Sequence, residues 1–401
     1  MPEAQDEAAT LWSQAALIDP YPIYRRLLSE TPISMMHGGL MLTRYADVLP
    51  ALRDPRLLAA RITPSEAWLA ETGLGPLFHA HSKMMLFSDP PDHTRLRSLV
   101  NKAFTPRVVE NMRPHIQQIV DDLLDRVQDT GQMDLIEDLA YPLPVTVIAE
   151  LLGIPLDRRE QFRHWSDHIA AFIGGTSAPE EQMLRNALQT VLEMTEYFRA
   201  VAAELRVNPR DDLLSALALA EEQGDRLHED ELVANCILLL VAGHETTTNL
   251  VGNGVLALLK HPEQLQRLKD DPALIGTAVE EFLRFDSPVQ GTSRMAGVDF
   301  EIGGQQLVAG QHVSLMIGAA NRDPAQFPDP DRLDIGRREN RHLSFSHGAH
   351  FCLGAPLARM EGRIAIGTLI QRMPRLELAT ETLEWRDNFT LRGVKALPVT
   401  F

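Results

Sequence analysis

The sequence predicts a mainly α-helical protein with a smaller β-rich part. Apolar residues recur three and four positions apart over long stretches, which is the helical period. These stretches lie near 110–128, 138–152, 184–206, 230–260 and 274–285. Strand signals are short, and they cluster near the N-terminus and in the last third of the chain.

The elements fit one domain over residues 1–401. The longest helix is predicted at 229–260, ended by His261-Pro262, and it is apolar nearly all round at its middle, so it should cross the core. A second predicted helix covers 355–373, inside a helical body of 92–285 and 355–373. The β-rich parts lie near 32–60 and 295–320 plus 375–401, with strand signals in ISMMHGGLMLTRY, FEIGGQQLVAG, QHVSLMIG and LEWRDNFTLRG.

Composition narrows the class of protein. The net charge of −17 argues against a general nucleic-acid binder. The acidic start MPEAQDEAAT has no apolar run, and CILLLVAG is far too short to cross a bilayer, so we expect no leader, no membrane anchor and a cytoplasmic location. Two cysteines without close spacing, Cys236 and Cys352, argue against a disulfide framework.

The stretch FSHGAHFCLG, residues 345–354, places Cys352 just before the second predicted helix. Gly348 and Gly354 permit turns and the close approach of a flat ligand. Phe345 can shield one side of the sulfur, and the N-terminal dipole of the following helix stabilises a thiolate.

Three readings of this cysteine are open from the residues alone. Cys352 can be a small core hydrophobe beside a glycine turn. It can bind zinc with His342, His347 and His350, although this spacing matches no common finger or ribbon pattern. A single thiolate as the sole protein ligand suits a haem iron better.

The ten-residue pattern resembles the haem-binding loop of the cytochrome P-450 superfamily, the haem-thiolate monooxygenases, and is closest to soluble bacterial members. The resemblance covers roughly residues 20–400. It implies a triangular, helix-rich prism with a long central helix, haem b (iron protoporphyrin IX) as cofactor, Cys352 as the iron ligand, and His350 as a haem propionate contact. Ser346 departs from the family, which often has glycine at that position.

The stretch LVAGHETTTN lies in the middle of the central helix. A bend with a threonine bonded back to the helix would explain it without chemistry, yet a buried acid is costly without a role. It matches the family pattern A-G-x-[DE]-T-T. The resemblance places Ala242 and Gly243 against the haem, where the missing side chain of Gly243 leaves room for a flat ring or dioxygen. It assigns Thr246 to dioxygen at the iron and Glu245 to proton relay.

Two further motifs fit the same resemblance. EEFLR gives Glu281 and Arg284, which the family pairs with a later arginine, here predicted as Arg332, to hold the cysteine loop. The i, i+3 pair alone would be an ordinary surface ion pair. HTRLR places His93 and Arg97 four apart on one helix face, a fork of cationic donors suited to a carboxylate, although a solvated basic helix would look the same. By resemblance His93, Arg97 and Arg294 hold the haem propionates.

Charge is unevenly distributed. Residues 93–107 carry Arg95, Arg97, Lys102 and Arg107 and no acid, and residues 332–363 carry six arginines against three acids. In an acidic chain, such segments favour an acidic electron donor docking on the Cys352 side, although some of these cations could serve only the propionates. The resemblance implies an external ferredoxin or flavodoxin with its reductase, since the sequence shows no reductase motif.

The implied activity is a monooxygenase that uses dioxygen and two electrons to hydroxylate or epoxidise a hydrophobic small molecule. Three alternatives stay open: a peroxide-driven peroxygenase, a non-catalytic haem sensor or carrier, and a zinc protein. The Glu245-Thr246 pair argues against the first, since the family's peroxygenases usually replace it. Residues expected to line the substrate pocket are mostly apolar: Met84, Met85, Phe87, Phe172, Leu239, Val289, Gln290 and Phe389.

Overall fold

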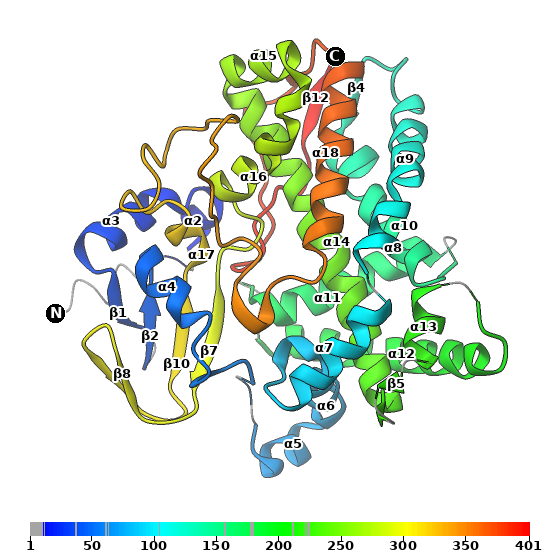
Figure 1. The fold of residues 1–401 in the computed structure, drawn as a ribbon, viewed down its shortest axis with the longest axis vertical. Coiled ribbons are helices and arrows are strands. Elements are labelled where there is room, and N and C mark those ends of the chain that lie inside the picture. The colour runs from blue at the N-terminus through cyan, green and yellow to red at the C-terminus, as the bar shows by residue number, and fades with distance from the viewer. Residues whose placement is uncertain are drawn as a thin grey trace. The chain divides into compact units, whose positions relative to one another are not determined.

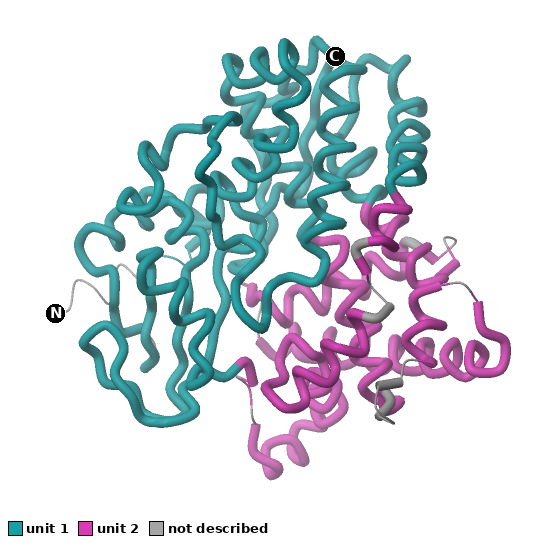
Figure 2. The backbone as a smooth tube through the Cα atoms, in the orientation of Figure 1, with its two compact units in different colours: residues 1–58, 113–143, 246–401 teal, residues 59–112, 144–245 magenta. Residues whose placement is uncertain are grey.

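The chain folds mainly into helices in a computed structural model, which confirms the predicted fold class. The structure describes residues 11–401 apart from 12, 37, 61, 63, 104, 156–157, 177–179, 211, 220 and 223–224. The first ten residues, on which the expected absence of a leader depends, lie outside this range. The chain forms two compact units, and the boundary between them falls inside the longest helix (Figure 2).

Unit 1 comprises residues 1–58, 113–143 and 246–401. Its helices are α2 (Gln14–Ile18), α3 (Tyr21–Glu30), α4 (Tyr45–Ala51), α9 (Arg113–Asp125), η3 (Ile136–Ala140), α15 (Pro262–Asp270), η5 (Pro272–Leu274), α16 (Ile275–Phe285), α17 (Ile317–Ala320), η6 (Gly348–His350) and α18 (Ala355–Arg372) (Figure 1). Its strands are β1 (Ile33–Met36), β2 (Gly39–Leu42), β3 (Leu57–Leu58), β4 (Gln132–Asp134), β7 (Thr292–Ala296), β8 (Phe300–Ile302), β9 (Gln305–Leu307), β10 (His312–Leu315), β11 (Glu377–Leu378) and β12 (Pro398–Thr400).

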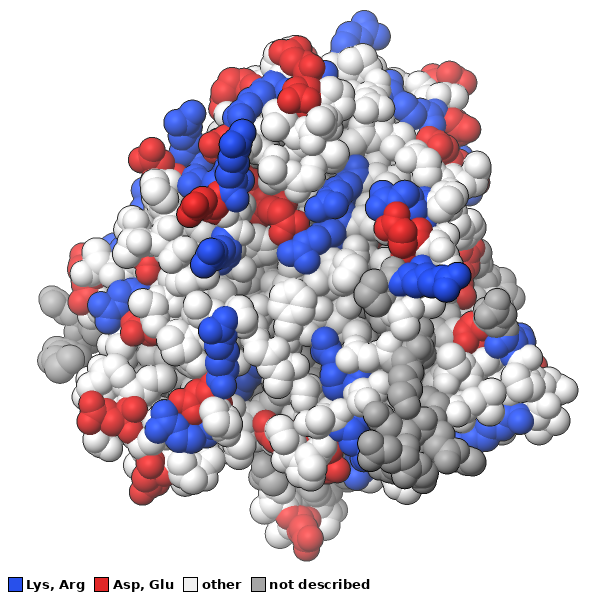
Figure 3. All heavy atoms as spheres, in the orientation of Figure 1, with Lys and Arg blue, Asp and Glu red and all other residues white. Residues whose placement is uncertain are grey.

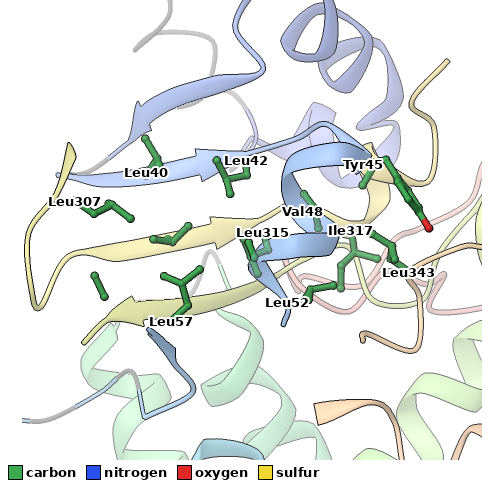
Figure 4. Close-up of a cluster of buried hydrophobic side chains, with 14 of the residues drawn as sticks. Leu40, Leu42, Tyr45, Val48, Leu52, Leu57, Leu307, Leu315, Ile317 and Leu343 are labelled. Carbon is green, nitrogen blue, oxygen red and sulfur yellow. The ribbon is translucent and has the colours of Figure 1, made fainter. Parts of the chain in front are cut away.

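The main sheet of unit 1 has the order β1-β2-β10-β7-β3. Only β2 and β10 run parallel, with Leu40 opposite Val313 and Leu42 opposite Leu315. One face of the sheet packs on α4 through buried aliphatic side chains, among them Val48 (Figure 4). The hairpin β8-β9 turns at the predicted Gly-Gly pair, Gly303 and Gly304, both in the left-handed region that this turn requires.

Unit 2 comprises residues 59–112 and 144–245. Its elements are α5 (Glu66–Thr72), α6 (Gly75–Lys83), η2 (Met85–Phe87), α7 (Asp92–Ala103), α8 (Pro106–Asn111), α11 (Arg159–Gly174), α12 (Glu180–Val207), α13 (Leu213–Leu219), β5 (Glu221–Glu222) and β6 (Asp225–Arg226). The helix α10 (Pro142–Leu151) begins in unit 1 and lies mainly in unit 2.

The longest helix is α14 (Glu229–Lys260), which has the bounds that the sequence predicts. It is buried over most of its length because its middle is apolar on every side. In unit 1 its close packing depends on Gly254, where a Cβ atom would come within 2.8 Å of the Phe282 ring. No helix among the described residues is long and apolar enough to cross a membrane.

The predicted C-terminal strand is wrong. The stretch LEWRDNFTLRG makes only isolated bridges, Trp385 with Val394 and Leu391 with Val289. The side chain of Asn388 accepts hydrogen bonds from the backbone N–H groups of Thr390 and Leu391, so these donors are withdrawn from a strand ladder. The single-domain assignment of residues 1–401 stays a prediction.

A buried carboxyl group lies in the core of unit 1. Glu361 on α18 is 1% exposed, and neither of its carboxyl oxygens makes a close hydrogen bond. Burial raises the pKa of Glu361 to about 8, and the nearby Thr247 hydroxyl on α14 offsets this only in part. Glu361 is therefore largely protonated at neutral pH, because an ionised carboxylate in this setting would be costly.

The pKa of Glu361 is higher in the folded chain than in the unfolded chain, so its contribution to the free energy of unfolding falls as the pH rises. Between about pH 4.5 and 8 the folded chain holds a proton on Glu361 that the unfolded chain releases, so this group lowers the free energy of unfolding by up to about 1.4 kcal/mol per pH unit. We expect Glu361→Gln to remove this slope in denaturant unfolding measured across that range. Glu196→Gln, on the exposed face of α12, is the control and should keep it; equal slopes in the wild type and Glu361→Gln would contradict the assignment.

Candidate active site

The cysteine loop is closed by its own backbone. The N–H of Cys352 donates to the carbonyl of Phe345 at 2.9 Å, which ties the two ends of the loop together. The helix α18 begins three residues after the cysteine, so its N-terminal dipole lies beside the sulfur. A Cβ atom at Gly354 would lie 4.0 Å from Cys352 Sγ. One cysteine sulfur, with no side chain at Gly354 beside it, is a donor set that fits a haem iron.

Two residues of the loop adopt left-handed backbone conformations. Gly348 has φ +72°, and a Cβ atom there would come within 3.1 Å of the Leu52 carbonyl oxygen. Ser346 has φ +60° and a buried hydroxyl without a hydrogen bond. The family's frequent glycine at this position therefore has a physical reason, and this chain accepts roughly 1–2 kcal/mol of strain by carrying serine.

A cation lies over the face of the Phe345 ring. The Arg359 guanidinium lies 4.4 Å from the centre of the Phe345 ring and donates two hydrogen bonds to Glu280, at 2.7 and 2.8 Å. His342 binds the same carboxylate at 3.1 Å. Burial alone would raise the pKa of Glu280, but these hydrogen bonds outweigh it and lower the pKa to about 2. Glu280 is therefore a permanent anion that links α16 to both ends of the cysteine loop.

The neighbouring Glu281 forms a fully buried cluster with Arg284. The two side chains are 0% exposed, and Arg284 donates to both carboxylate oxygens at 2.8 Å. The second arginine of this cluster is Arg337, at 3.2 Å from Glu281 Oε2. Asn340 Nδ2 and the backbone N–H of Asp334 donate to the same carboxylate.

The prediction of Arg332 as the partner of Glu281 is wrong. The Arg332 side chain is exposed, and it contributes only its backbone carbonyl, which accepts from Arg284 and Arg337. Arg332 and Arg337 belong to the same proline-rich loop. A turn at Asp329, which has φ +47°, precedes them, and the backbone beyond it aims Arg337 inward.

The two arginines make a matched pair for mutation. Arg337→Ala removes one of two cations from a buried carboxylate, and we expect the free energy of unfolding to fall by about 3 kcal/mol. Arg332→Ala should change it by no more than about 0.5 kcal/mol, because its guanidinium is in solvent. Guanidinium unfolding of the haem-loaded protein measures both; a larger loss for Arg332→Ala would overturn the cluster.

The α14 residues that are predicted to face the haem and dioxygen form an accessible stripe. Ala242 is exposed, and Gly243 and Thr246 are partly exposed, in a helix that is otherwise buried on either side of them. Spacings of three and four place them on one helix face. This stripe is the second feature that fits a bound flat cofactor.

Near this stripe, one residue differs from its prediction and one was not predicted. A Cβ atom at Gly243 would come within 3.0 Å of the Ile148 side chain, so the glycine serves close packing of α14 on α10 and does not open space for a ring. His244 is also buried, with Nε2 at 3.8 Å from Glu245 Oε2, which places a titratable group beside the predicted relay acid. His244 occupies the unspecified position of the pattern A-G-x-[DE]-T-T, so the pattern did not indicate a role for it.

The predicted propionate contacts lie in both units. In unit 2, His93 is buried on α7, and Arg97 is on the same face one turn later. Arg95 is paired with Glu231 and is not part of this face. In unit 1, Arg294 is 5% exposed on β7 and donates to the Ser293 carbonyl at 2.8 Å. His350 is partly exposed in η6.

The predicted pocket residues fall into two groups. In unit 2, Phe87 stacks on His81 with ring centres 3.8 Å apart, and Phe172 meets His81 edge-on at 5.7 Å. The α14 residue Asn235 accepts from the Met85 N–H at 3.0 Å and so fixes η2, with Met84 preceding it and Leu239 one turn further along α14. His81 was not foreseen.

In unit 1 the second group is brought together by backbone pairing. Val289 bridges to Leu391, and the Gln290 N–H donates to the Thr390 carbonyl at 2.8 Å. Gln290 and Phe389 line the same pocket, but the Gln290 amide is already engaged, accepting from the Tyr24 hydroxyl at 2.9 Å and donating to the Ser287 carbonyl at 2.7 Å.

The zinc alternative finds no support in the described part of the chain, where no three His, Cys, Asp or Glu side chains are placed to share a metal ion. Of its proposed ligands, His342 is instead bonded to Glu280.

The chain is similar to known proteins over nearly its whole length. The cytochrome P450 family model matches residues 76–377. Cytochrome P450 107B1 of Saccharopolyspora erythraea is 47% identical over 399 residues, 95% of each chain. P450BioI, solved in complex with a hexadec-9Z-enoic acid-ligated acyl carrier protein, is 42% identical, with a TM-score of 0.91 over 97% of this chain and 100% of that one. Myxobacterial CYP267B1, solved in complex with myristic acid, is 45% identical, with a TM-score of 0.90 over 98% of each chain.

The chain belongs to the cytochrome P450 family. Its cofactor is haem, iron protoporphyrin IX, and it is a monooxygenase that acts on a substrate with dioxygen. The resemblance stated from the sequence is thereby confirmed at the level of family, fold, cofactor and reaction class, and the peroxygenase alternative is not favoured.

Proposed function

We propose that Cys352 would be the protein ligand of the haem iron and that Thr246 and Glu245 would deliver protons for the dioxygen chemistry. The arrangement that carries this proposal is the cysteine loop: a thiolate at the N-terminus of α18, closed by its bond to Phe345 and braced by Glu280 and Glu281. When bound, haem supplies the dioxygen chemistry; the protein supplies binding, orientation and protons.

Each residue then has a defined task. The Cys352 sulfur would hold the iron and, as a thiolate, would supply it with electron density. The Thr246 hydroxyl, on the accessible stripe of α14, holds a proton donor in place, and the buried Glu245 carboxyl, with His244 at 3.8 Å, passes protons toward it. His93, Arg97, Arg294 and His350 would bind the two propionates as cationic or N–H donors. Phe345, Gly348, Gly354 and Ala242 would contact the ring or shape the loop around it, and Gly243 would let α14 pack closely on α10 beside it.

The substrate that we propose is hydrophobic and of moderate size, and it is hydroxylated or epoxidised. The aromatic and methionine side chains around Phe87 support this, because such surfaces recognise apolar shape with few polar contacts. Two similar solved structures contain fatty acyl chains, a hexadec-9Z-enoic acid and a myristic acid. The substrate class that we propose comprises terpenoids, fatty acids, steroids and polyketides.

We further propose that an external ferredoxin or flavodoxin, with its reductase, docks on the Cys352 side, and that the reaction occurs in the cytoplasm. Figure 3 shows basic side chains scattered among acidic ones over the displayed face. Much of the predicted positive charge is used internally, since Arg337 and Arg359 face Glu281 and Glu280. Among the described residues Arg338 and Arg341 are exposed without an ion pair, and Phe351 beside Cys352 is 41% exposed. These three support the docking site; the side chain of Lys102 is not described.

Carbon monoxide tests the iron ligand. We expect the reduced, carbon monoxide-treated protein to show the strongly red-shifted Soret band of a thiolate opposite carbon monoxide. Cys352→Ser should abolish this band position. Cys236→Ser, which changes the buried cysteine of α14, should keep it. A wild-type band at the ordinary position in haem-loaded protein would refute the ligand assignment.

Thr246→Ala tests proton delivery. Without the hydroxyl we expect electron consumption to continue while product per electron pair falls severalfold and peroxide release rises. Thr248→Ala is the matched control, because the Thr248 hydroxyl is buried without a hydrogen bond two residues along the same helix. Product and reduced cofactor are measured together under saturating electron donor; unchanged coupling in Thr246→Ala, or an equal fall in both variants, would contradict the role.

A further inference from the structure

Two histidines on α11 lie side by side, and neither has been assigned a role above. His164 and His168 are four positions apart and therefore share a helix face. Their ring centres are 4.2 Å apart, with the ring planes at 62°. His164 is exposed and His168 partly buried, so the pair opens to solvent. Imidazoles at this helical spacing can chelate one transition-metal ion on a single helix face.

The neighbouring helix α12 completes the surroundings of the pair. Nδ1 of His168 lies 2.9 Å from the Thr190 hydroxyl, which orients the ring and leaves Nε2 as the nitrogen available to a metal. Metal-binding histidines commonly use their other ring nitrogen in this way. In the described part of the chain no set of three potential ligands was placed to hold a metal, so water would complete the coordination.

Charge around the pair also suits a cation. The Glu193 carboxylate on α12 accepts from Trp165 Nε1 and from Gln189 Nε2, each at 2.7 Å, and these bonds lower its pKa, with a further contribution from both histidines. Burial, and then the neighbouring His164, lowers the pKa of His168, while Asp167 and Glu193 oppose this. The Glu193 carboxylate is therefore an anion near the two histidines.

We propose that His164 and His168 bind a divalent transition-metal ion of the zinc class, with Glu193 balancing its charge. The site lies wholly in unit 2. It would lock one turn of α11 and, through Thr190 and Glu193, strengthen its packing on α12, whose position beside α11 is visible in Figure 1. The proposal is independent of the haem site, because none of its residues has a role there.

Zn²⁺ titration of the haem-loaded, full-length protein against a chromophoric chelator tests the site. We expect one Zn²⁺ per chain that raises the thermal midpoint, with His164→Gln and His168→Gln each weakening it at least tenfold and Glu193→Gln weakening it less. His164 is exposed, so its variant should fold normally, as circular dichroism without metal will show.

His115→Gln is the control, because it removes an exposed histidine from a different helix, α9. It should bind Zn²⁺ as the wild type does. Absence of binding in the wild type, or equal binding by wild type and both His164→Gln and His168→Gln, would overturn the proposal.

Discussion

The geometry of the cysteine loop depends on one buried anion, the carboxylate of Glu281. A charge with no access to solvent is stable only when its hydrogen-bonding capacity is filled by matched donors. Arg284 comes from the same helix, while Arg337, Asn340 and the Asp334 N–H come from the irregular segment that leads to the loop. That segment has no helix or strand to fix its path. Its hydrogen bonds to the Glu281 carboxylate fix the path instead.

Glu280, the residue before Glu281, is also a carboxylate held by cationic partners, but it points to other segments of the chain. Consecutive helical residues point about a quarter-turn apart, so Glu280 reaches Arg359 on α18 and His342 near the start of the loop. The helix α16 therefore fastens both the approach to Cys352 and the helix that follows it. Two adjacent carboxylates, each with its own cations, thus fix the segments on either side of Cys352.

Much of the fold and the candidate site could be predicted because the controlling signals are local. Apolar periodicity and His261-Pro262 define α14, and the Gly303-Gly304 pair defines a hairpin. The choice between Arg332 and Arg337 could not be predicted, because it depends on the turn at Asp329 and the backbone path beyond it. The contact of Gly243 with Ile148 likewise joins segments about a hundred residues apart and leaves no pattern in either one.

In the C-terminal stretch a local signal was misleading. The alternation of LEWRDNFTLRG is typical of a strand, but Asn388 captures two backbone donors and turns the chain instead. A short polar side chain that competes for the backbone can thus override the period of its neighbours.

The protonated Glu361 has a consequence for the chain as an electrolyte. The formal charge of −17 counts this residue as an anion, yet in the folded protein near pH 7 it is mostly neutral. Folding at that pH therefore takes up close to one proton from the solution through this residue alone. In a weakly buffered medium, proton uptake at Glu361 on folding makes the solvent more alkaline, and this residue adds almost no negative charge to the native chain.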